Sequence, residues 1–363
     1  MKNKLWLDET DAALDDAATR YTRDRYRFED RHLLTPSQRR FSNDVWMDMA
    51  EMGWLGVSTP EEDGGLGVRL TSICLLAEVA GRALINEPLT SCGFLAPFLV
   101  AHNGSPAQRA ELLPRLLSGH LPVACVLGPV SEAMHVESGA LHGRQAVVVD
   151  GDMADHLLVL ARDGDKAEAL YLVDANGGGV NRKSFPLLDG RSGATVTLKG
   201  CAAILLGNAD MTANAQPALW LAVLATAADS LGAMSAAFDL TLDYLKTRRQ
   251  FGKPLGTYQA LQHRAVDMYL QLSESRAVLD QAIESVQADA VTAERDVHAA
   301  KTFICQAARK VLQEAIQLHG GIGITDEYMV SHYLRRVRVN EQLYGSAEQH
   351  FRSFATSTSS NLH

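Results

Sequence analysis

The segment NEQLYGSAEQHF, residues 340–351, brings two acids close to a turn that interrupts a helical pattern near the end of the chain. Glu341 and Glu348 each lie three or four residues from Tyr344, which is about one helical turn or roughly 5–6 Å of rise. A carboxylate beside such a turn could serve as a general base. Each glutamate could equally be a surface charge, so the segment is either a helix-ending turn or a site.

Two other stretches combine polar side chains with glycine. TRRQFGK, residues 247–253, carries an arginine pair, and QLHGGIG, residues 317–323, carries a glycine pair. Taken alone, each fits an ordinary helix end, where arginines interact with the last carbonyl groups and a glycine such as Gly252 caps the helix. Clusters of His, Cys or acidic residues with convincing metal spacing are absent from the sequence, so no metal site is predicted.

The composition limits the class of protein. A length of 363 residues predicts two or three domains. The net charge of −9 argues against a nucleic-acid partner, because a phosphate backbone requires a basic surface. No apolar run approaches the roughly 20 residues of a membrane span, and the N-terminus has no apolar signal core. Five scattered cysteines without a CxxC pair predict reduced thiols in a cytoplasmic protein.

The residue pattern that must position these stretches changes twice along the chain. Residues 1–120 are predicted to be a helical domain. Residues 121–212 contain short β-branched runs broken by Gly and Asp, which predict antiparallel strands joined by tight turns. Residues 213–363 return to helical spacing and end in a polar tail from about residue 353. The predicted helices of this third region span about 213–249, 257–288, 292–319 and 326–342.

Long helices with short connections are typical of an antiparallel bundle. The predicted fold class is therefore α+β, mostly α. It comprises an N-terminal helical domain, a small middle β-barrel or sandwich, and a C-terminal four-helix bundle.

The domain order and three local motifs resemble the acyl-CoA dehydrogenase family. TRRQFGKPLGTYQALQHRAVDM and QLHGGIGITDEYMVSHYLRR resemble the family's flavin-binding C-terminal domain, and MGWLGVSTPEEDGGLG is similar to part of its N-terminal domain. The resemblance is strong in the last third, fair in the first and poor in the middle. It implies oxidation of an acyl-CoA thioester to its 2,3-enoyl form, in which a carboxylate removes the α-proton while the β-hydrogen leaves as hydride to the flavin.

The resemblance also implies which residues contact FAD. Arg248 matches the family's pyrophosphate-binding arginine, a role suited to a guanidinium that can donate two hydrogen bonds to one phosphate. Gln317 and Gly321 match residues along the adenosine-pyrophosphate, where glycine allows close backbone approach. In the family these segments reach across an interface to the neighbouring subunit's flavin, so a dimer is implied. The implied cofactor contacts are Arg248, Gln250, Phe251, Gln259, Gln317, Gly320, Gly321 and Ser346.

The part of the family's site that holds a subunit's own flavin is poorly matched. The family carries Thr-Glu-Pro where this chain has VACVLGPVSEA, residues 123–133. A later Trp-Ile-Thr strand corresponds to Val147 and Val149, and valine neither hydrogen-bonds the flavin ring nor offers it an aromatic face. These strands are therefore expected to be ordinary β-domain core.

The family's catalytic glutamate corresponds to Tyr344, and the following Gly-Ser corresponds to its Gly-Thr. A tyrosine hydroxyl, with a pKa of about 10, is poorly matched to removing a thioester α-proton at neutral pH. A base position used by other members, on the first bundle helix, falls on Ala222. No catalytic residue is therefore assigned. Glu348 and Glu341 remain fallback bases and are otherwise expected to be surface charges.

What is missing belongs to the chain's own flavin and base, and what is retained belongs to the neighbour's flavin. The leading hypothesis is a non-catalytic subunit that completes the shared FAD site of a catalytic acyl-CoA dehydrogenase partner, in a heterotetramer with two flavins. Such pairs are associated with bulky acyl-CoA substrates, notably CoA thioesters of steroid side chains. Two alternatives stay open: a self-sufficient homomeric dehydrogenase with a relocated base, and a flavin-free scaffold protein. Neither nucleic acid nor membrane is an expected partner.

Overall fold

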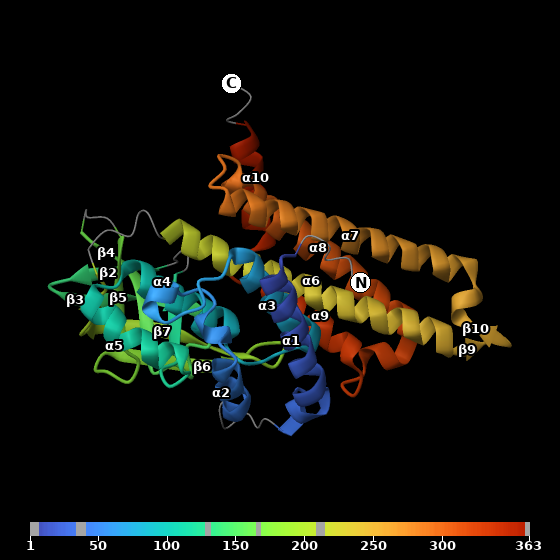
Figure 1. Ribbon diagram of the computed structural model, residues 1–363, viewed down its shortest axis with the longest axis horizontal. Helices are drawn as coiled ribbons and strands as arrows, with labels where there is room; N and C mark the ends of the chain where they lie inside the picture. Colours follow the sequence, from blue (N-terminus) through green and yellow to red (C-terminus); the bar gives the residue numbers. More distant parts are fainter. Residues whose placement is uncertain (1–6, 34–40, 128–131, 165–167, 208–214, 360–363) are drawn as a thin grey trace. The chain divides into compact units, whose positions relative to one another are not determined.

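The computed structural model describes residues 7–33, 41–127, 132–164, 168–207 and 215–359 (Figure 1). The chain is mostly helical with one mixed sheet, which confirms the predicted fold class. The chain divides into two compact units, each made of separate segments. The three consecutive domains predicted from the sequence, with boundaries near residues 120 and 212, stay a prediction. The "C-terminal unit" comprises Met1–Arg31, Cys74–Ile85 and Val223–His363, and the "sheet unit" comprises His32–Ile73 and Asn86–Ala222.

The sheet unit contains an eight-stranded sheet in the order β6-β7-β3-β2-β4-β5-β8, with β1 beside β4. Most neighbours are antiparallel, as predicted, but β1 and β2 both pair with β4 in parallel. The prediction of an antiparallel sheet was wrong at these two pairs, because residue alternation identifies strands and not their neighbours. The strands are β1 (Val123–Val126), β2 (Glu132–Glu137), β3 (Ala140–Val149), β4 (His156–Asp163), β5 (Glu168–Asp174), β6 (Val180–Pro186), β7 (Ser192–Cys201) and β8 (Ile204–Leu205).

Leucine and valine side chains of these strands form one apolar core, which includes Leu157, Val173 and Val196. Val148 is also buried in this core, whereas the preceding Val147 is exposed. The valines matched to the family's Trp-Ile-Thr strand are Val147 and Val149, which lie two residues apart on the opposite face from Val148, and Val149 is only partly buried. The expectation that both belong to the β-domain core was therefore wrong. Residues 128–131, within the stretch matched to the family's Thr-Glu-Pro, lie outside the described residues.

Short helices complete the sheet unit. Ser105 begins α5 with a reciprocal cap, in which its Oγ accepts the N–H of Gln108 and the Gln108 side chain accepts the N–H of Ser105. The chain passes between the two units within α3 (Leu70–Ala83) and α6 (Ala215–Thr247), and also between residues 31 and 32 and between residues 85 and 86. The other helices are α2 (Asn43–Glu51), η2 (Trp54–Gly56), η3 (Glu61–Asp63), η4 (Leu89–Leu95, a π-helix), α4 (Ala96–Asn103) and α5 (Pro106–Leu117).

The C-terminal unit is helical, and α8 packs against α7, α9 and α10. Residues predicted to be a polar tail form the end of α10. The first bundle helix ends at Thr247, not at Arg249, and Gly252 lies in the turn of a small hairpin instead of capping the helix. The remaining elements are α1 (Glu9–Arg25), η1 (Phe28–Leu33), β9 (Arg249–Gln250), β10 (Lys253–Pro254), η5 (Leu255–Thr257), α7 (Gln259–Gln287), α8 (Ala293–His319), η6 (Gly320–Ile324), α9 (Met329–Asn340) and α10 (Ala347–Ser359).

Two glycines let the backbones of α3 and α6 touch. A Cβ on Gly81 would lie 1.9 Å from the carbonyl oxygen of Asp229, and one on Gly232 would lie 2.0 Å from that of Glu78. Helix α6 is long and apolar enough to cross a membrane, so the expectation that no apolar run approaches that length was wrong. However, 94% of its most apolar window is buried inside the protein. Such burial is the behaviour of a core helix, and it fits the close contact with α3.

Candidate functional site

The turn matched to the family's active site lies between α9 and α10. Tyr344 adopts a left-handed backbone conformation with φ of 55°, and Gly345 follows with φ of 100°. His350 Nε2 lies 3.1 Å from the carbonyl oxygen of Tyr344. A Cβ on residue 345 would lie 2.7 Å from that same nitrogen, so the site accommodates only glycine. The turn is therefore a fixed local structure and not a frayed helix end.

Ser346 begins helix α10. Its Oγ accepts the N–H of Gln349 at 3.2 Å, and the Gln349 side-chain oxygen accepts the N–H of Ser346 at 2.7 Å. These reciprocal bonds satisfy two otherwise unpaired helix donors. The serine thus has a structural role in this chain, and its contact with FAD stays a prediction.

A buried lysine stabilises the turn through hydrogen bonds to its backbone. Lys301 on α8 is completely buried, and its Nζ donates to the carbonyl oxygens of Asn340 at 2.6 Å and Leu343 at 3.1 Å. The hydroxyl of Thr226 on α6 is 3.4 Å away. Burial lowers the pKa of Lys301, while the carbonyl groups at the C-terminal end of α9 attract its positive charge. The sequence analysis missed this residue, whose only signal was a lysine between buried positions of α8.

A buried ion pair connects α6 to α9 beside this lysine. Arg336 contacts both carboxylate oxygens of Asp229, with Nε 2.9 Å from Oδ1 and Nη2 2.7 Å from Oδ2. The side-chain nitrogen of Asn340 donates to Asp229 Oδ1 at 2.6 Å. Both charged side chains are buried, so each depends on the other to offset the cost of leaving water. This pair was also missed, because its members are far apart in the sequence.

The two fallback bases occupy different environments. Glu341 is only 7% exposed, and its carboxylate lies 2.7 Å from Arg338 and 3.8 Å from Arg309. The expectation of a surface charge was therefore wrong for Glu341, because arginines of α8 and α9 enclose it. Glu348 is an exposed side chain paired with Arg352 on the same helix, as expected of a surface charge. Ala222, the other matched base position, is buried in α6.

Two histidines join α8 to α10. His298 Nδ1 and His350 Nδ1 are 2.8 Å apart, so one ring must donate a proton and the other must accept it. Burial lowers the pKa of His350 to about 4 and also lowers the pKa of His298, although Glu294 at 3.7 Å partly opposes the latter shift. Both rings are therefore neutral at pH 7. Since His350 also contacts the Tyr344 carbonyl, the pair supports the turn.

The first predicted cofactor segment forms the β9–β10 hairpin. Phe251 lies in its turn with φ of 52° and is 91% exposed. The hydroxyl of Tyr258 donates to the carbonyl oxygen of Gln250 at 3.2 Å, and Lys253 Nζ lies 4.2 Å from the centre of the Tyr258 ring. Arg249 Nη2 donates to the carbonyl oxygen of Gly252 at 3.1 Å. Contacts within the segment thus stabilise the hairpin, while Phe251 at its tip remains exposed.

The polar side chains predicted to meet the pyrophosphate are exposed. Arg248, Gln250, Gln259 and Gln317 all reach the surface, and within the described ranges their side chains make no hydrogen bond or ion pair. A Cβ on Gly320 or Gly321 would meet no atom within 4 Å. Packing inside the C-terminal unit therefore does not explain why these four polar side chains leave their hydrogen-bond donors unpaired. It also does not explain why residue 321 is a glycine.

An aromatic cluster brings the two segments to one end of the C-terminal unit. The ring of His319, at the end of α8, lies 4.5 Å from the ring of Tyr244, near the end of α6. The Tyr328 hydroxyl lies 3.3 Å from His319 Nε2. Because the hairpin follows α6 and the glycine pair follows α8, these contacts place both predicted segments close together.

This arrangement fits the pyrophosphate end of FAD. It presents an uncommitted guanidinium and carboxamide groups, which suit phosphate oxygens, and open space at Gly320 and Gly321 for close backbone approach. Across the parts of the chain that the structure describes, no group of three or more His, Cys, Asp or Glu side chains could hold a metal ion.

Comparisons with known protein families identify the class. The acyl-CoA dehydrogenase N-terminal domain matches residues 8–120, and the acyl-CoA dehydrogenase C-terminal domain matches residues 214–358. Mitochondrial isovaleryl-CoA dehydrogenase of Arabidopsis thaliana is 30% identical over 337 residues, which cover 85% of this chain and 81% of that protein. The chain belongs to the acyl-CoA dehydrogenase family, a family of flavin-dependent oxidoreductases.

The chain is also similar to individual proteins with more specific names. Acyl-CoA dehydrogenase IpdE2 of Mycolicibacterium smegmatis is 29% identical over 317 residues, covering 87% of this chain and 88% of that protein. The solved Tcur3481–Tcur3483 steroid ACAD variant is 29% identical with a TM-score of 0.89, covering 98% and 99% of the two chains. A glutaryl-CoA dehydrogenase from Mycobacterium smegmatis in complex with FADH2 shares the fold at 20% identity, with a TM-score of 0.89 and coverage of 98% and 96%.

Proposed function

We propose that this chain is the non-catalytic subunit of a heteromeric FAD-dependent acyl-CoA dehydrogenase, completing the flavin site of a catalytic partner. One contrast carries the proposal. The family's base position holds Tyr344 in a turn fixed by Lys301 and His350, whereas the side chains of Arg248 and Gln317 are exposed and make no hydrogen bond or ion pair within the described residues. A chain that lacks a catalytic base but keeps phosphate-binding groups is suited to completing the binding site of a flavin that another subunit uses.

In this proposal, each predicted residue contacts a different part of the partner's FAD. Arg248 and Gln317 would donate hydrogen bonds to the pyrophosphate of the partner-held FAD, with Gln250 and Gln259 beside them. Gly320 and Gly321 would allow the backbone to approach the cofactor, and Phe251 would cover its adenosine end. The bound flavin supplies a hydride acceptor for desaturation of the acyl-CoA thioester.

The substrate class and assembly follow from the same proposal. The similar Tcur3481–Tcur3483 protein is a steroid ACAD named for two components, which supports a heteromer acting on a bulky acyl group such as a steroid side-chain CoA ester. A heterotetramer would then contain two flavins for four chains.

A relocated base is less well supported. Glu341 is enclosed by Arg338 and Arg309, and Glu348 is exposed beside Arg352. In the active assembly, Glu341→Gln and Glu348→Gln should both leave the proton-abstraction step unchanged, measured as the rate of flavin bleaching by acyl-CoA in single-turnover stopped-flow experiments. A loss of at least tenfold in either variant would assign that glutamate as the base.

Co-expression with a family member that carries the catalytic glutamate tests the main proposal. The complex should bind FAD and desaturate acyl-CoA, and Arg248→Ala should lower its flavin content. Arg352→Ala is the matched control, because Arg352 is an exposed arginine of α10. Purification of this chain alone as a fully flavinated, active homotetramer would overturn the proposal, and the absence of flavin from every assembly would favour a scaffold protein.

A further inference from the structure

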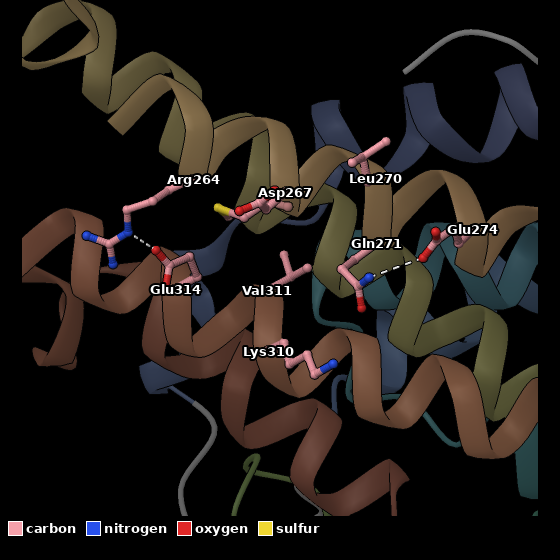
Figure 2. Close-up of a pocket in the computed structure, with 9 residues that line it drawn as sticks. Arg264, Asp267, Leu270, Gln271, Glu274, Lys310, Val311 and Glu314 are labelled. Atoms are coloured by element: carbon pink, nitrogen blue, oxygen red, sulfur yellow. Dashed lines mark hydrogen bonds and ion pairs between the residues drawn. The ribbon is translucent and has the colours of Figure 1, made fainter. Parts of the chain in front are cut away.

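Helix α8 is linked to its neighbours by two different kinds of side-chain contact. Figure 2 shows Arg264 of α7 and Glu314 of α8 directed toward each other across a groove of about 560 Å³. Toward α10, His298 Nδ1 of α8 lies 2.8 Å from His350 Nδ1. The first contact joins a guanidinium to a carboxylate. The second joins two imidazoles, the side chains whose charge can change between about pH 5 and 8.

Few buried side chains hold α10 in place. Among residues 347–357, only Ala347 and His350 are buried. The hydroxyl of Thr302 on α8 also donates to the carbonyl oxygen of Ala347, at a distance of 3.5 Å. Because segments with few buried contacts open most easily, the short bond between the two histidines is a principal restraint on α10.

The contacts of His350 determine where the protons of the uncharged pair lie. His350 Nε2 is 3.1 Å from the carbonyl oxygen of Tyr344, which can only accept a hydrogen bond, so Nε2 carries a proton. In a neutral ring the other nitrogen, Nδ1, is then an acceptor. The proton between the two rings therefore belongs to His298 Nδ1, which donates to His350.

This arrangement leaves His298 Nε2 without a proton, 3.7 Å from the carboxylate of Glu294. Both groups are acceptors, so the contact is unsatisfied while the pair is uncharged. One proton added at His298 Nε2 pairs the ring with Glu294 and keeps the bond to His350. A second proton, on His350, places N–H groups on both Nδ1 atoms, which cannot face each other at 2.8 Å. The pair therefore accommodates one added proton and not two.

The surrounding charges act on the pair in opposite directions. Burial lowers the pKa of His350 to about 4, and the positive charge of Lys301 on α8 further opposes its protonation. Glu294 favours protonation of His298. The nearby acids Glu341, at the end of α9, and Glu348, on α10, are each paired with arginines. Glu294 is thus the carboxylate that the described residues place against the histidines.

We propose that Glu294, His298 and His350 form a pH-sensitive switch, which keeps α10 and the Tyr344 turn packed on α8 at neutral pH and releases them when both rings are protonated. The turn is included because the His350 ring packs against it, with Nε2 only 2.7 Å from where a Cβ on Gly345 would lie. The switch goes beyond the proposed function, and it does not depend on it, because none of the three side chains is a proposed FAD contact.

Hydrogen–deuterium exchange of the full chain, followed by mass spectrometry, tests for the release. With labelling times scaled to the intrinsic exchange rate, protection of α10 should fall at least about tenfold as the pH drops from about 7 to about 4. Peptides of α7 are the internal reference, because the Arg264–Glu314 contact contains no imidazole. Unchanged protection of α10, or an equal loss in α7 and α10, would overturn the proposal.

Two substitutions assign the release to the proposed groups. In His298→Asn, the side-chain amide takes the position of Nδ1 and can donate to His350, or turn its oxygen toward a protonated His350, without itself titrating. Protection of α10 should therefore persist at low pH. Wild-type pH dependence in this variant would refute the switch.

The second substitution, Glu294→Gln, changes a side chain that is 59% exposed, so the fold should be unaffected. It removes the negative charge that favours protonated His298, so the release should move to lower pH by at least about half a unit. Glu348→Gln is the matched control on α10 and should leave the release where it is in the wild type. An unchanged release in Glu294→Gln, or an equal shift in Glu348→Gln, would contradict the assignment.

Discussion

At the residue scale, the buried charges beneath the Tyr344 turn make the C-terminal unit sensitive to single substitutions. Asp229→Asn removes the charge that compensates Arg336, and both side chains are buried. Leaving one buried charge uncompensated is expected to cost about 3–5 kcal/mol of unfolding free energy. Urea unfolding followed by circular dichroism measures this loss. Glu348→Gln, which breaks an exposed pair, should cost less than about 1 kcal/mol; comparable losses in the two variants would contradict this account.

The His298–His350 pair makes stability depend on pH. Burial lowers the folded-state pKa of His350 to about 4, below the unfolded value of about 6.5. Between these values the unfolded chain binds more protons, so stability should fall as pH drops from about 6.5 toward about 4. Melting temperatures across this range should decline less steeply for His350→Gln than for the wild type. Parallel declines would show that other groups dominate.

At the residue scale, the sequence allowed roles to be predicted only where a motif was contiguous, and it missed contacts whose partners lie on different elements. Arg248, Gln317 and the glycine pair were assigned from contiguous segments and lie exposed, and their contacts with FAD stay predictions. The burial of Glu341 was not predicted, because one of its two arginine partners, Arg309, lies on another helix. Lys301 was missed because sequence pattern does not reveal carbonyl acceptors supplied by a distant turn.

At the element scale, glycines distinguish helix packing from an open surface. Gly81→Ala would place a Cβ 1.9 Å from the carbonyl oxygen of Asp229 and force α3 away from α6. We expect it to lower the unfolding free energy by at least about 1–3 kcal/mol. Gly321→Ala meets no atom within 4 Å and should leave the melting temperature unchanged. Thermal unfolding of both variants checks the contrast, and a stable Gly81→Ala protein would contradict the tight helix contact.

Element prediction was accurate for long periodic helices and weaker elsewhere. The predicted helix at 292–319 corresponds closely to α8, Ala293–His319, whose apolar spacing is regular. Helix α10, Ala347–Ser359, was not predicted, because the last predicted helix ended at about residue 342. Its serine- and threonine-rich end has weak helix propensity, and the helix is stabilised by the Ser346 cap and by packing against α8. The parallel pairing of β1 and β2 with β4 was missed because pairing depends on the path of the whole chain.

At the scale of the whole molecule, the domain order was predictable because each region has its own periodicity. The proposed sharing of a cofactor between subunits could not be predicted from periodicity, since it would depend on surfaces completed by another chain. The proposed role therefore rests on groups that the described part of the chain leaves uncommitted, led by Arg248 and Gln317.

At the scale of the whole molecule, Gly321→Ala is predicted to weaken cofactor binding without affecting folding. Because this alanine should not disturb packing, its effect should appear only where the backbone approaches FAD. The assembled complex should retain its mass and melting behaviour in the absence of FAD but bind FAD at least about tenfold more weakly, a difference of about 1.4 kcal/mol. Fluorescence titration of the apo-complex with FAD measures the affinity. Unchanged FAD affinity would remove Gly321 from the shared site.

The flavin-to-chain ratio of the purified assembly is the most direct test of the central claim. Absorbance at about 450 nm gives the flavin content, and quantitative mass spectrometry gives the amount of each chain. A shared, partner-held cofactor predicts one FAD for each pair of unlike chains, and no stoichiometric FAD on this chain purified alone. One FAD per copy of this chain, retained without a partner and accompanied by acyl-CoA desaturation, would contradict the account.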